Sequence, residues 1–163
     1  MVNALLDAAT TRFAAHGPSA VSVRDVADAA GVNHGLVHRH FGSKRALLGA
    51  VLDRLAARVA AATAAGESPD EADLDAYWRV LARAILDGED VSDLQHGYPT
   101  VTALLTAAAQ DGLDPSAARV ATARAVALGL GARLFAPFIR SAVGLDDEEA
   151  ATAFGVREAG ADE

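Results

Sequence analysis

Apolar positions recur at helical spacing along almost the whole chain. A first apolar face lies between residues 3 and 15 and consists of Leu5, Leu6, Ala9 and Phe13. A second, longer face follows residue 43 and comprises Leu47, Leu48, Val51, Leu52, Leu55 and Val59. Members three or four residues apart share one side of an α-helix and turn it toward a core. The sequence has no alternating β-branched runs bounded by turn residues, so the pattern predicts an all-α protein.

Two short helices joined by a tight turn are predicted within residues 22–44, SVRDVADAAGVNHGLVHRHFGSK. Ser22 and Asp25 form an S-x-x-D start signal, in which each side chain can accept a free N–H of the first turn. The first helix then carries an apolar stripe of Val23, Val26, Ala27 and Ala30. We therefore expect a helix that begins at a fixed residue and packs through one face.

The turn between these helices is expected at Gly31, where a residue in the left-handed conformation ends the first helix. Val32 follows as a buried plug, and Asn33 can cap a second helix over residues 35–41. Ala27 suits a close crossing of the two helices, because a larger side chain would not fit there. These are the requirements of a helix-turn-helix, whose second helix enters the DNA major groove. A merely structural helix pair is the alternative.

The segments around this turn resemble the N-terminal domain of the TetR family of bacterial transcriptional regulators. Three stretches carry the resemblance: LLDAATTRFAAHG, SVRDVADAAGV and the junction HFGSK-x-x-LL. It covers residues 3–55 and implies three helices followed by a long fourth. Beyond residue 60 it implies only a helical, dimeric, ligand-binding architecture. We therefore expect a DNA-binding domain over residues 1–45, joined by a long helix to a helical-bundle ligand-binding and dimerisation domain over residues 46–163.

Polar side chains of the second short helix are the main candidates for contact with DNA. An asparagine can pair bidentately with adenine, an imidazole can donate to guanine or phosphate, and a glycine lets the backbone approach closely. Lys44 opens the following helix, where free N–H groups, the helix dipole and a mobile ammonium favour a phosphate. The predicted DNA-contacting residues are Ser22, Asn33, His34, Gly35, His38, Arg39, His40 and Lys44.

His38 departs from the family pattern, which usually has an aromatic residue, most often Tyr, at this position. The Tyr hydroxyl typically donates to a DNA phosphate, and an imidazole can do the same with a charge that depends on pH. Arg39 likewise stands where a second aromatic or a His is common. His34 and His38 are four residues apart, a spacing that can also bind a metal, but no acid or cysteine completes the ligand set. We expect neither a metal nor a cofactor.

The chain beyond residue 60 is expected to be helical throughout. The expected elements are a helix from the start signal Ser68-Pro69-Asp70-Glu71 to Gly88, with Pro at the first helical position, a helix from Pro99 to Gly112, a long helix from Asp114 to about Phe135, and a short helix from Asp146 to Phe154. Pro137 kinks or ends the long helix. The polar tail over residues 155–163 is expected to fray.

Bulky side chains in this part are candidates for an effector pocket, because the resemblance implies that such residues line a cavity between helices. They are Tyr77, Trp78, Leu81, Ile85, Leu104, Leu105, Phe135 and Phe138. Plain core packing is the alternative for each of them. Arg79 and His96 are further candidates for polar anchors of a small, mostly apolar effector.

Small residues give the long helix a surface that allows close helix contact, namely Ala125, Ala127, Gly129, Gly131 and Ala132. Such a surface suits a four-helix dimer interface, with tight packing inside one subunit as the alternative. A helix-turn-helix typically reads two half-sites as a dimer. We therefore expect a homodimer on a near-palindromic operator in double-stranded DNA.

The net charge of −8 is unevenly distributed. Residues 1–60 hold seven basic and four acidic side chains, which gives +3, whereas the remainder carries −11. A basic head on an acidic body lets phosphates attract one end only, which orients the protein on approach to DNA.

Other classes of protein find little support in the composition. The absence of cysteine excludes disulfides and thiolate metal sites and fits a cytoplasmic location. No apolar run approaches the roughly 18–20 residues of a membrane helix and no basic leader precedes an apolar core, so neither membrane insertion nor secretion is expected. Without a Ser-His-Asp set, a phosphate loop or a metal signature, an enzyme is not expected either.

The sequence therefore predicts a DNA-binding transcriptional regulator, a repressor released from its operator by a small molecule. The alternative is a helical ligand-binding or scaffold dimer whose helix-turn-helix has lost DNA binding. The substitution at His38 is the sequence support for that alternative.

Overall fold

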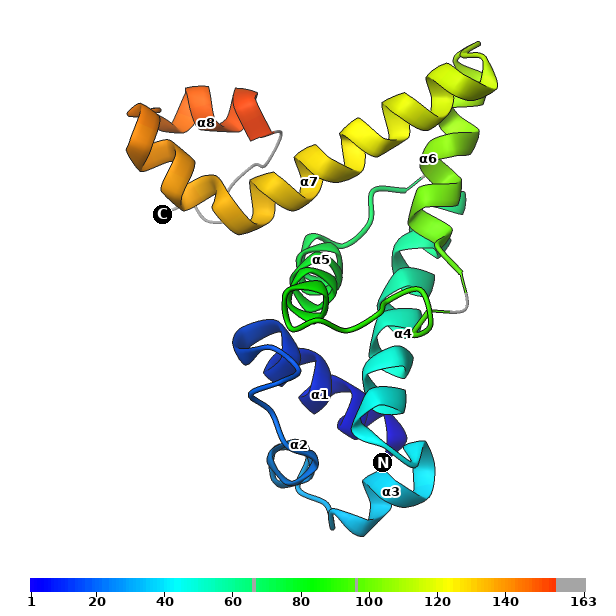
Figure 1. Cartoon of the computed structure of the whole chain (residues 1–163), viewed down its shortest axis with the longest axis vertical. Coiled ribbons are helices and arrows are strands. Elements are labelled where there is room, and N and C mark those ends of the chain that lie inside the picture. The colour runs from blue at the N-terminus through cyan, green and yellow to red at the C-terminus, as the bar shows by residue number, and fades with distance from the viewer. Residues whose placement is uncertain (66, 96, 155–163) are drawn as a thin grey trace. The chain divides into compact units, whose positions relative to one another are not determined.

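Every regular element is an α-helix in the computed structural model, which describes residues 1–65, 67–95 and 97–154 (Figure 1). The helices in these ranges are α1 (Val2–His16), α2 (Val23–Ala29), α3 (Gly35–Phe41), α4 (Lys44–Ala64), α5 (Glu71–Leu86), α6 (Pro99–Gln110), α7 (Pro115–Val143) and α8 (Asp147–Phe154). The predicted all-α fold class is confirmed. The tail over residues 155–163 lies outside the described residues.

The chain divides into two compact units, Met1–Leu104 and Leu105–Glu163, with the division inside α6. This division follows packing: α5 shares a unit with the three helices of the predicted DNA-binding domain. The boundary after residue 45 divides the chain by role instead, and it stays a prediction.

Helix α1 lies at the centre of the first unit, because α2, α4 and α5 all pack against it. Its predicted inward face is buried, with Leu5, Ala9 and Phe13 fully enclosed. The predicted face of α4 is buried at every position, Leu47, Leu48, Val51, Leu52, Leu55 and Val59. Burial of one such side chain stabilises the fold by about 1.5–3 kcal/mol. The helix-turn-helix is therefore supported by a core to which α5 also contributes.

Helix α5 begins later than the sequence suggested. Asp70 is its N-cap and accepts the N–H of Asp73 at 3.0 Å, so Pro69 precedes the cap and is not the first helical residue as predicted. A carboxylate at the N-cap satisfies a first-turn N–H directly, and this determines where the helix begins. At the other end Asp87 is the C-cap, and Gly88 follows with φ of +83°.

The segment between α5 and α6 approaches α4 closely at Gly49. A Cβ atom on Gly49 would lie 2.8 Å from the carbonyl oxygen of Leu94. Leu94 itself is buried, and Arg45 binds Glu89 at 3.3 Å and the carbonyl oxygen of Asp90 at 3.3 Å. The connection after α5 is thus held along the first two turns of α4.

In the second unit, α7 runs further than predicted. Asp114 caps its start by accepting the N–H groups of Ser116 and Ala117, as expected. The predicted end near Phe135 is wrong, because the helix continues through Pro137 to Val143. Proline removes one backbone donor without preventing helix on both sides, and the end comes instead at Gly144, a left-handed residue with φ of +77°.

The surface of α7 is largely apolar and exposed. Its exposed large side chains are Val120, Leu128, Phe135, Phe138 and Val143. By length and composition alone, this helix is also long and apolar enough to cross a membrane, with a mean hydropathy of 1.4 over its best window. This contradicts the expectation that no stretch is long enough, because arginines interrupt the apolar run in the sequence without lowering its mean hydropathy far.

We predict that Gly49→Ala destabilises the protein, although alanine favours helix at an unconstrained site. The added methyl group would collide with the Leu94 carbonyl, and both are backbone-anchored. Overpacking of this kind costs about 1–3 kcal/mol, more than the helix propensity that alanine gains. Urea denaturation measures the difference. A midpoint equal to or above that of the wild type would contradict the close contact.

Candidate nucleic-acid interface

The start of α2 is fixed by a reciprocal cap between Ser22 and Asp25. The Asp25 N–H donates to Ser22 Oγ at 3.2 Å, and the Ser22 N–H donates to Asp25 Oδ2 at 2.8 Å. The Ser22 hydroxyl also donates to that oxygen at 2.7 Å. These bonds, the backbone one first, hold the pKa of the Asp25 carboxyl below its usual range. The predicted capping box is present, and it engages the hydroxyl of Ser22 within the helix.

The turn after α2 has the geometry that the sequence predicts. Gly31 has φ of +66°, a conformation that favours glycine, and the Val32 N–H donates to the Ala27 carbonyl at 3.0 Å. Ala27 is fully buried, as the close crossing of α2 and α3 requires. Val32 is only half-buried, so its expected role as a buried plug is wrong. Its backbone N–H contributes to the turn more than its side chain does.

The start of α3 differs by one residue from the prediction. The N-cap is His34, whose side chain makes no capping hydrogen bond, so Asn33 is not the cap that the sequence suggested. The Asn33 Oδ1 accepts the N–H of Gly35, the first helical residue, at 2.8 Å. A Cβ on Gly35 would lie 3.2 Å from the same oxygen, which explains why the absence of a side chain helps here. Because Oδ1 already accepts one bond, Asn33 has one acceptor position and its amide N–H groups left for a base.

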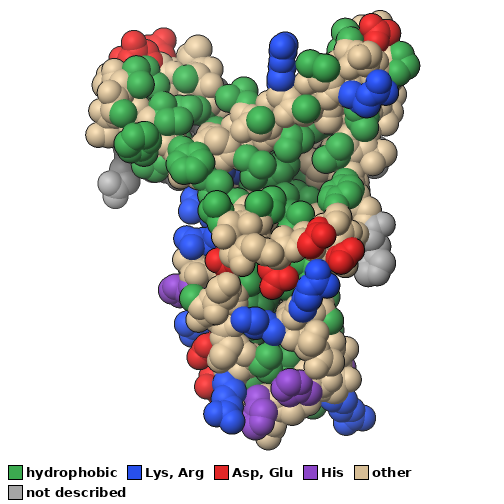
Figure 2. Space-filling view, viewed as in Figure 1, with side chains coloured by type: hydrophobic (Ala, Val, Ile, Leu, Met, Phe, Trp, Pro, Cys, Tyr) green, Lys and Arg blue, Asp and Glu red, His purple; other side chains and the backbone are tan. Residues whose placement is uncertain are grey.

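Helix α3 presents a polar face to solvent. His34, His38, Arg39 and His40 are exposed, whereas Val37 on the opposite side is fully buried. In Figure 2, histidine and basic side chains gather at the end of the first unit that α2 and α3 form. Among the described residues no group of three or more His, Cys, Asp or Glu side chains is arranged to hold a metal. The exposed face is thus suited to hydrogen bonding with bases and phosphates.

His38 contacts its own chain at the end of α3. Its Nδ1 lies 3.2 Å from the carbonyl oxygen of Gly42. A carbonyl only accepts, so Nδ1 must carry the proton in this contact. In the neutral ring Nε2 is then an acceptor, and only the imidazolium can donate from Nε2 to a phosphate. While Nδ1 donates to Gly42, a contact from Nε2 to a phosphate, like that of a Tyr hydroxyl, would need a second ring proton.

Lys44 is placed differently from expectation. Its Nζ donates to the Pro18 carbonyl at 2.8 Å, and the side chain is half-buried. The prediction of a mobile charge is therefore wrong, because the ammonium is anchored to the connection between α1 and α2. Ser43 caps α4 by accepting the Ala46 N–H at 3.0 Å, as expected.

The predicted effector-pocket residues fall into different environments. Tyr77, Trp78 and Leu81 are buried in the first unit, whereas Ile85 is exposed and Leu104 is half-buried. In the second unit, Leu105 is half-buried and Phe135 and Phe138 are exposed. The grouping of these side chains around one ligand stays a prediction.

The polar surroundings of Tyr77 are defined more closely. Gln95 Nε2 donates to the Tyr77 hydroxyl at 3.4 Å, and burial raises the pKa of that hydroxyl. The Tyr77 and Trp78 rings meet edge to face, 5.2 Å between centroids. Of the two further anchors expected, Arg79 pairs with Asp75 at 2.7 Å on the surface, and His96 lies outside the described residues.

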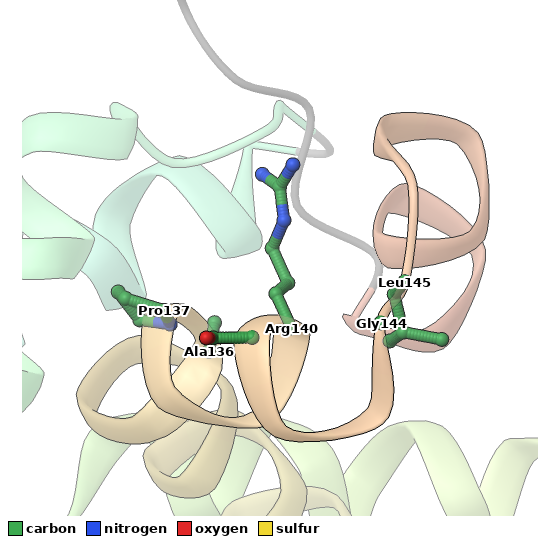
Figure 3. A pocket seen from close by; sticks show the side chains of 6 residues that line it. Ala136, Pro137, Arg140, Gly144 and Leu145 are labelled. Carbon is green, nitrogen blue, oxygen red and sulfur yellow. The ribbon is translucent and has the colours of Figure 1, made fainter.

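An open pocket that the sequence did not reveal lies at the end of α7 (Figure 3). It has a volume of about 600 Å³ and is lined by Ala136, Pro137, Arg140, Ser141, Gly144 and Leu145. Arg140 binds Asp147 across the turn to α8. None of the lining residues was a predicted pocket residue. Pro137 inside an apolar run was the sequence signal for irregular packing here.

The capped helix pair with an exposed polar second helix defines a DNA-binding regulator of the helix-turn-helix class. Comparison with known proteins gives the family. The sequence pattern of bacterial regulatory proteins of the tetR family matches residues 5–51. The chain is 49% identical over 146 residues to the HTH-type transcriptional regulator Mb3439c of Mycobacterium bovis. The matched region covers 88% of this chain and 78% of that relative. The chain belongs to the TetR family.

Two further comparisons agree. The HTH-type transcriptional repressor Rv3405c of Mycobacterium tuberculosis shows the same 49% identity over 88% of this chain and 78% of its own. A solved tetR family structure from a Shewanella species shares the fold, with a TM-score of 0.57 at 19% identity over 94% of both chains. The protein is therefore a DNA-binding transcriptional regulator, and family membership decides against an enzyme.

We predict that the capping box weakens in acid. The hydrogen bonds of the capping box lower the pKa of the Asp25 carboxyl, so they stabilise the folded state only while this group is ionised. Their contribution is complete above the usual carboxyl pKa of about 4 and is lost as the pH falls through the lowered pKa. Hydrogen exchange of the α2 amides should accelerate there more in the wild type than in Asp25→Asn, which lacks the titrating group. Identical pH profiles for the two proteins would contradict the cap.

Proposed function

We propose that this regulator is a homodimeric repressor that reads a near-palindromic operator through α3 and leaves it when a small apolar effector binds. The observation that carries the proposal is the exposed polar face of α3, which is anchored in the core by Val37 and bonded through the Gly35 N–H to Asn33. The relative named a transcriptional repressor supports repression in particular. The site of action is the DNA, which favours a cytoplasmic protein.

Roles on DNA follow from the geometry of each side chain. His34 and the remaining donors of Asn33 lie at the start of α3, the part of a recognition helix that contacts base edges. Arg39 and His40 supply donors to phosphate or guanine. Ser22 and Lys44 act indirectly, because their internal hydrogen bonds hold the start of α2 and the connection before it in place. Gly35 permits the close approach of the helix start.

The loss of DNA binding, the alternative function, rested on His38. The ring retains an outward nitrogen that can donate when protonated, so the substitution changes the conditions of contact and does not abolish it. This favours a DNA-binding protein.

A second copy of the chain is the proposed occupant of the exposed apolar surface of α7. Lipid is disfavoured because four arginines, Arg119, Arg124, Arg133 and Arg140, are distributed along the helix. Charges within a membrane span are costly, whereas they are tolerated at the rim of a helical interface. Two copies would also supply the two DNA-reading helices that paired half-sites require.

Release by an effector requires that it bind one arrangement of the helices better than the other. A hundredfold loss of operator affinity needs about 2.7 kcal/mol of such coupling. Tyr77 and Trp78 on α5 are the proposed sensors, because their buried rings meet edge to face and the Tyr77 hydroxyl accepts a hydrogen bond from Gln95. An apolar effector with few polar groups suits these surroundings.

The proposed function predicts selective operator binding to which the exposed His38 ring contributes. The probe is a duplex that the wild type selects from a random-sequence pool, and binding is measured by fluorescence anisotropy. Footprinting on DNA upstream of the protein's own gene would then locate the operator. His38→Phe should weaken this binding, because phenylalanine cannot donate to a phosphate. His16→Gln, which changes an exposed histidine at the end of α1, should leave it unchanged.

Two outcomes would count against different parts of this prediction. If the wild type selects no duplex, the DNA-reading function is wrong. If it selects one but His38→Phe binds that duplex as tightly as the wild type does, only the role of His38 is wrong.

If two copies of the chain pair through α7, Gly129→Leu and Gly131→Leu should lower the fraction of dimer. Within one chain a Cβ at either glycine has nothing within 4 Å, so the change should leave the helix content intact. A close contact with the partner helix would be forced apart. Light scattering and circular dichroism separate the two effects. A monomeric wild type, or leucine variants that dimerise as well as it does, would overturn this interface.

A further inference from the structure

The connection between α1 and α2 is a short turn that determines where α2 begins. Gly17 follows α1 with φ of +83°, and Pro18 is fully buried behind it. The Val21 N–H donates to the Pro18 carbonyl at 3.4 Å, and the Val21 side chain is 3% exposed. Ser22, the next residue, caps α2. Any shift of this turn therefore reaches the helix-turn-helix within one residue.

Two side chains from outside the turn bind it from different helices. Lys44, the first residue of α4, donates to the Pro18 carbonyl at 2.8 Å. Asp87, the C-cap of α5, accepts the Ser19 N–H on its Oδ2 at 2.7 Å. We call Lys44, Pro18, Ser19 and Asp87 the clasp. Its two bonds engage the carbonyl of one residue and the N–H of the next.

Gly17 fits the clasp closely. A Cβ on Gly17 would lie 3.2 Å from Asp87 Oδ2 and 3.8 Å from the Cβ of Arg83. The end of α5 therefore reaches the turn only because this residue has no side chain and tolerates positive φ. The approach of α5 to the turn is thus a built contact.

The end of α5 also contacts α4. Two residues after Asp87, Glu89 binds Arg45 of α4 at 3.3 Å. Because Asp87 is the C-cap of α5, a displacement of this helix end would be transmitted to the turn through the Ser19 hydrogen bond. Helix α5 also carries Tyr77 and Trp78 in the core.

We propose that Asp87 is a positioning residue for DNA reading and that the clasp is the route by which the state of α5 reaches α2. The inference rests on the proposed function, since it concerns regulation of the same DNA-reading surface. It assigns a role to a residue far in sequence from the helix-turn-helix. The route through Asp87 runs directly from α5 to the turn before α2, in addition to any path along α4.

The sign of the effect distinguishes positioning from simple charge. Removal of a carboxylate makes the protein less negative, so electrostatics alone would strengthen its binding to every DNA sequence. Loss of the Ser19 bond would instead misplace α2 and α3 and weaken binding to the selected sequence only. The ratio of specific to non-specific affinity therefore isolates the positioning role, because partial unfolding would lower both affinities equally.

The test compares Asp87→Ala with Asp87→Asn in the full-length protein. The specific probe is the duplex selected by the wild type, and the non-specific probe is a scrambled duplex of equal length. Asp87→Ala should lower the affinity ratio about tenfold, the scale of one hydrogen bond to a charged group. Asp87→Asn keeps an acceptor oxygen and should stay near the wild-type ratio. Asp75→Asn removes a charge from the same helix away from the turn and serves as the control.

A second measurement keeps the test decisive. Hydrogen exchange at the Ser19 amide and in α2 should be faster in Asp87→Ala than in Asp87→Asn, and Asp87→Ser, whose side chain is too short to reach Ser19, replaces the alanine variant if that variant does not fold. An unchanged ratio in the alanine or serine variant, or an asparagine variant as defective as alanine, would overturn the proposal. A wild type that selects no duplex would instead refute the proposed function itself.

Discussion

Burial of α1 is the constraint on which the rest of the first unit depends. Phe13 and Leu5 have no exposed surface, and the helices that enclose α1 are α2, α4 and α5. Because one helix has neighbours on several sides, none of these neighbours can move without exposing apolar surface of α1. A DNA-reading head of this kind is therefore joined to α5 by a shared core. Its attachment to α4 is only part of the connection.

Polar contacts then determine register on top of that core. The reciprocal cap of Ser22 and Asp25 fixes the start of α2, and the Asn33 side chain binds the N–H of the first residue of α3. Helices of seven residues are too short to be stable alone, so their caps and the buried Val26 and Val37 act together. Ser22 and Lys44, which the sequence offered as DNA contacts, already form hydrogen bonds within the protein. Some residues of the motif therefore hold the helices in place, and others remain exposed for contact with DNA.

The most regular features of the fold could be predicted because they depend on local spacing. The apolar faces of α1 and α4, the turn at Gly31 and the capping box at Ser22 all follow from residues within one or two helical turns of each other. The TetR family resemblance was equally local, and comparison over most of the chain bears it out. The end of α7 was harder to predict, because Pro137 breaks a local rule without ending the helix.

The sequence by itself thus determined the class of protein, the helix pair and the polar face of α3. Tertiary structure alone decided that Lys44 binds Pro18, that Asp87 reaches Ser19 and that Gly49 lies against Leu94. The partners of the two hydrogen bonds are 26 and 68 residues apart in the sequence. No periodicity relates residues so far apart, since only the packing of α1, α4 and α5 brings them together.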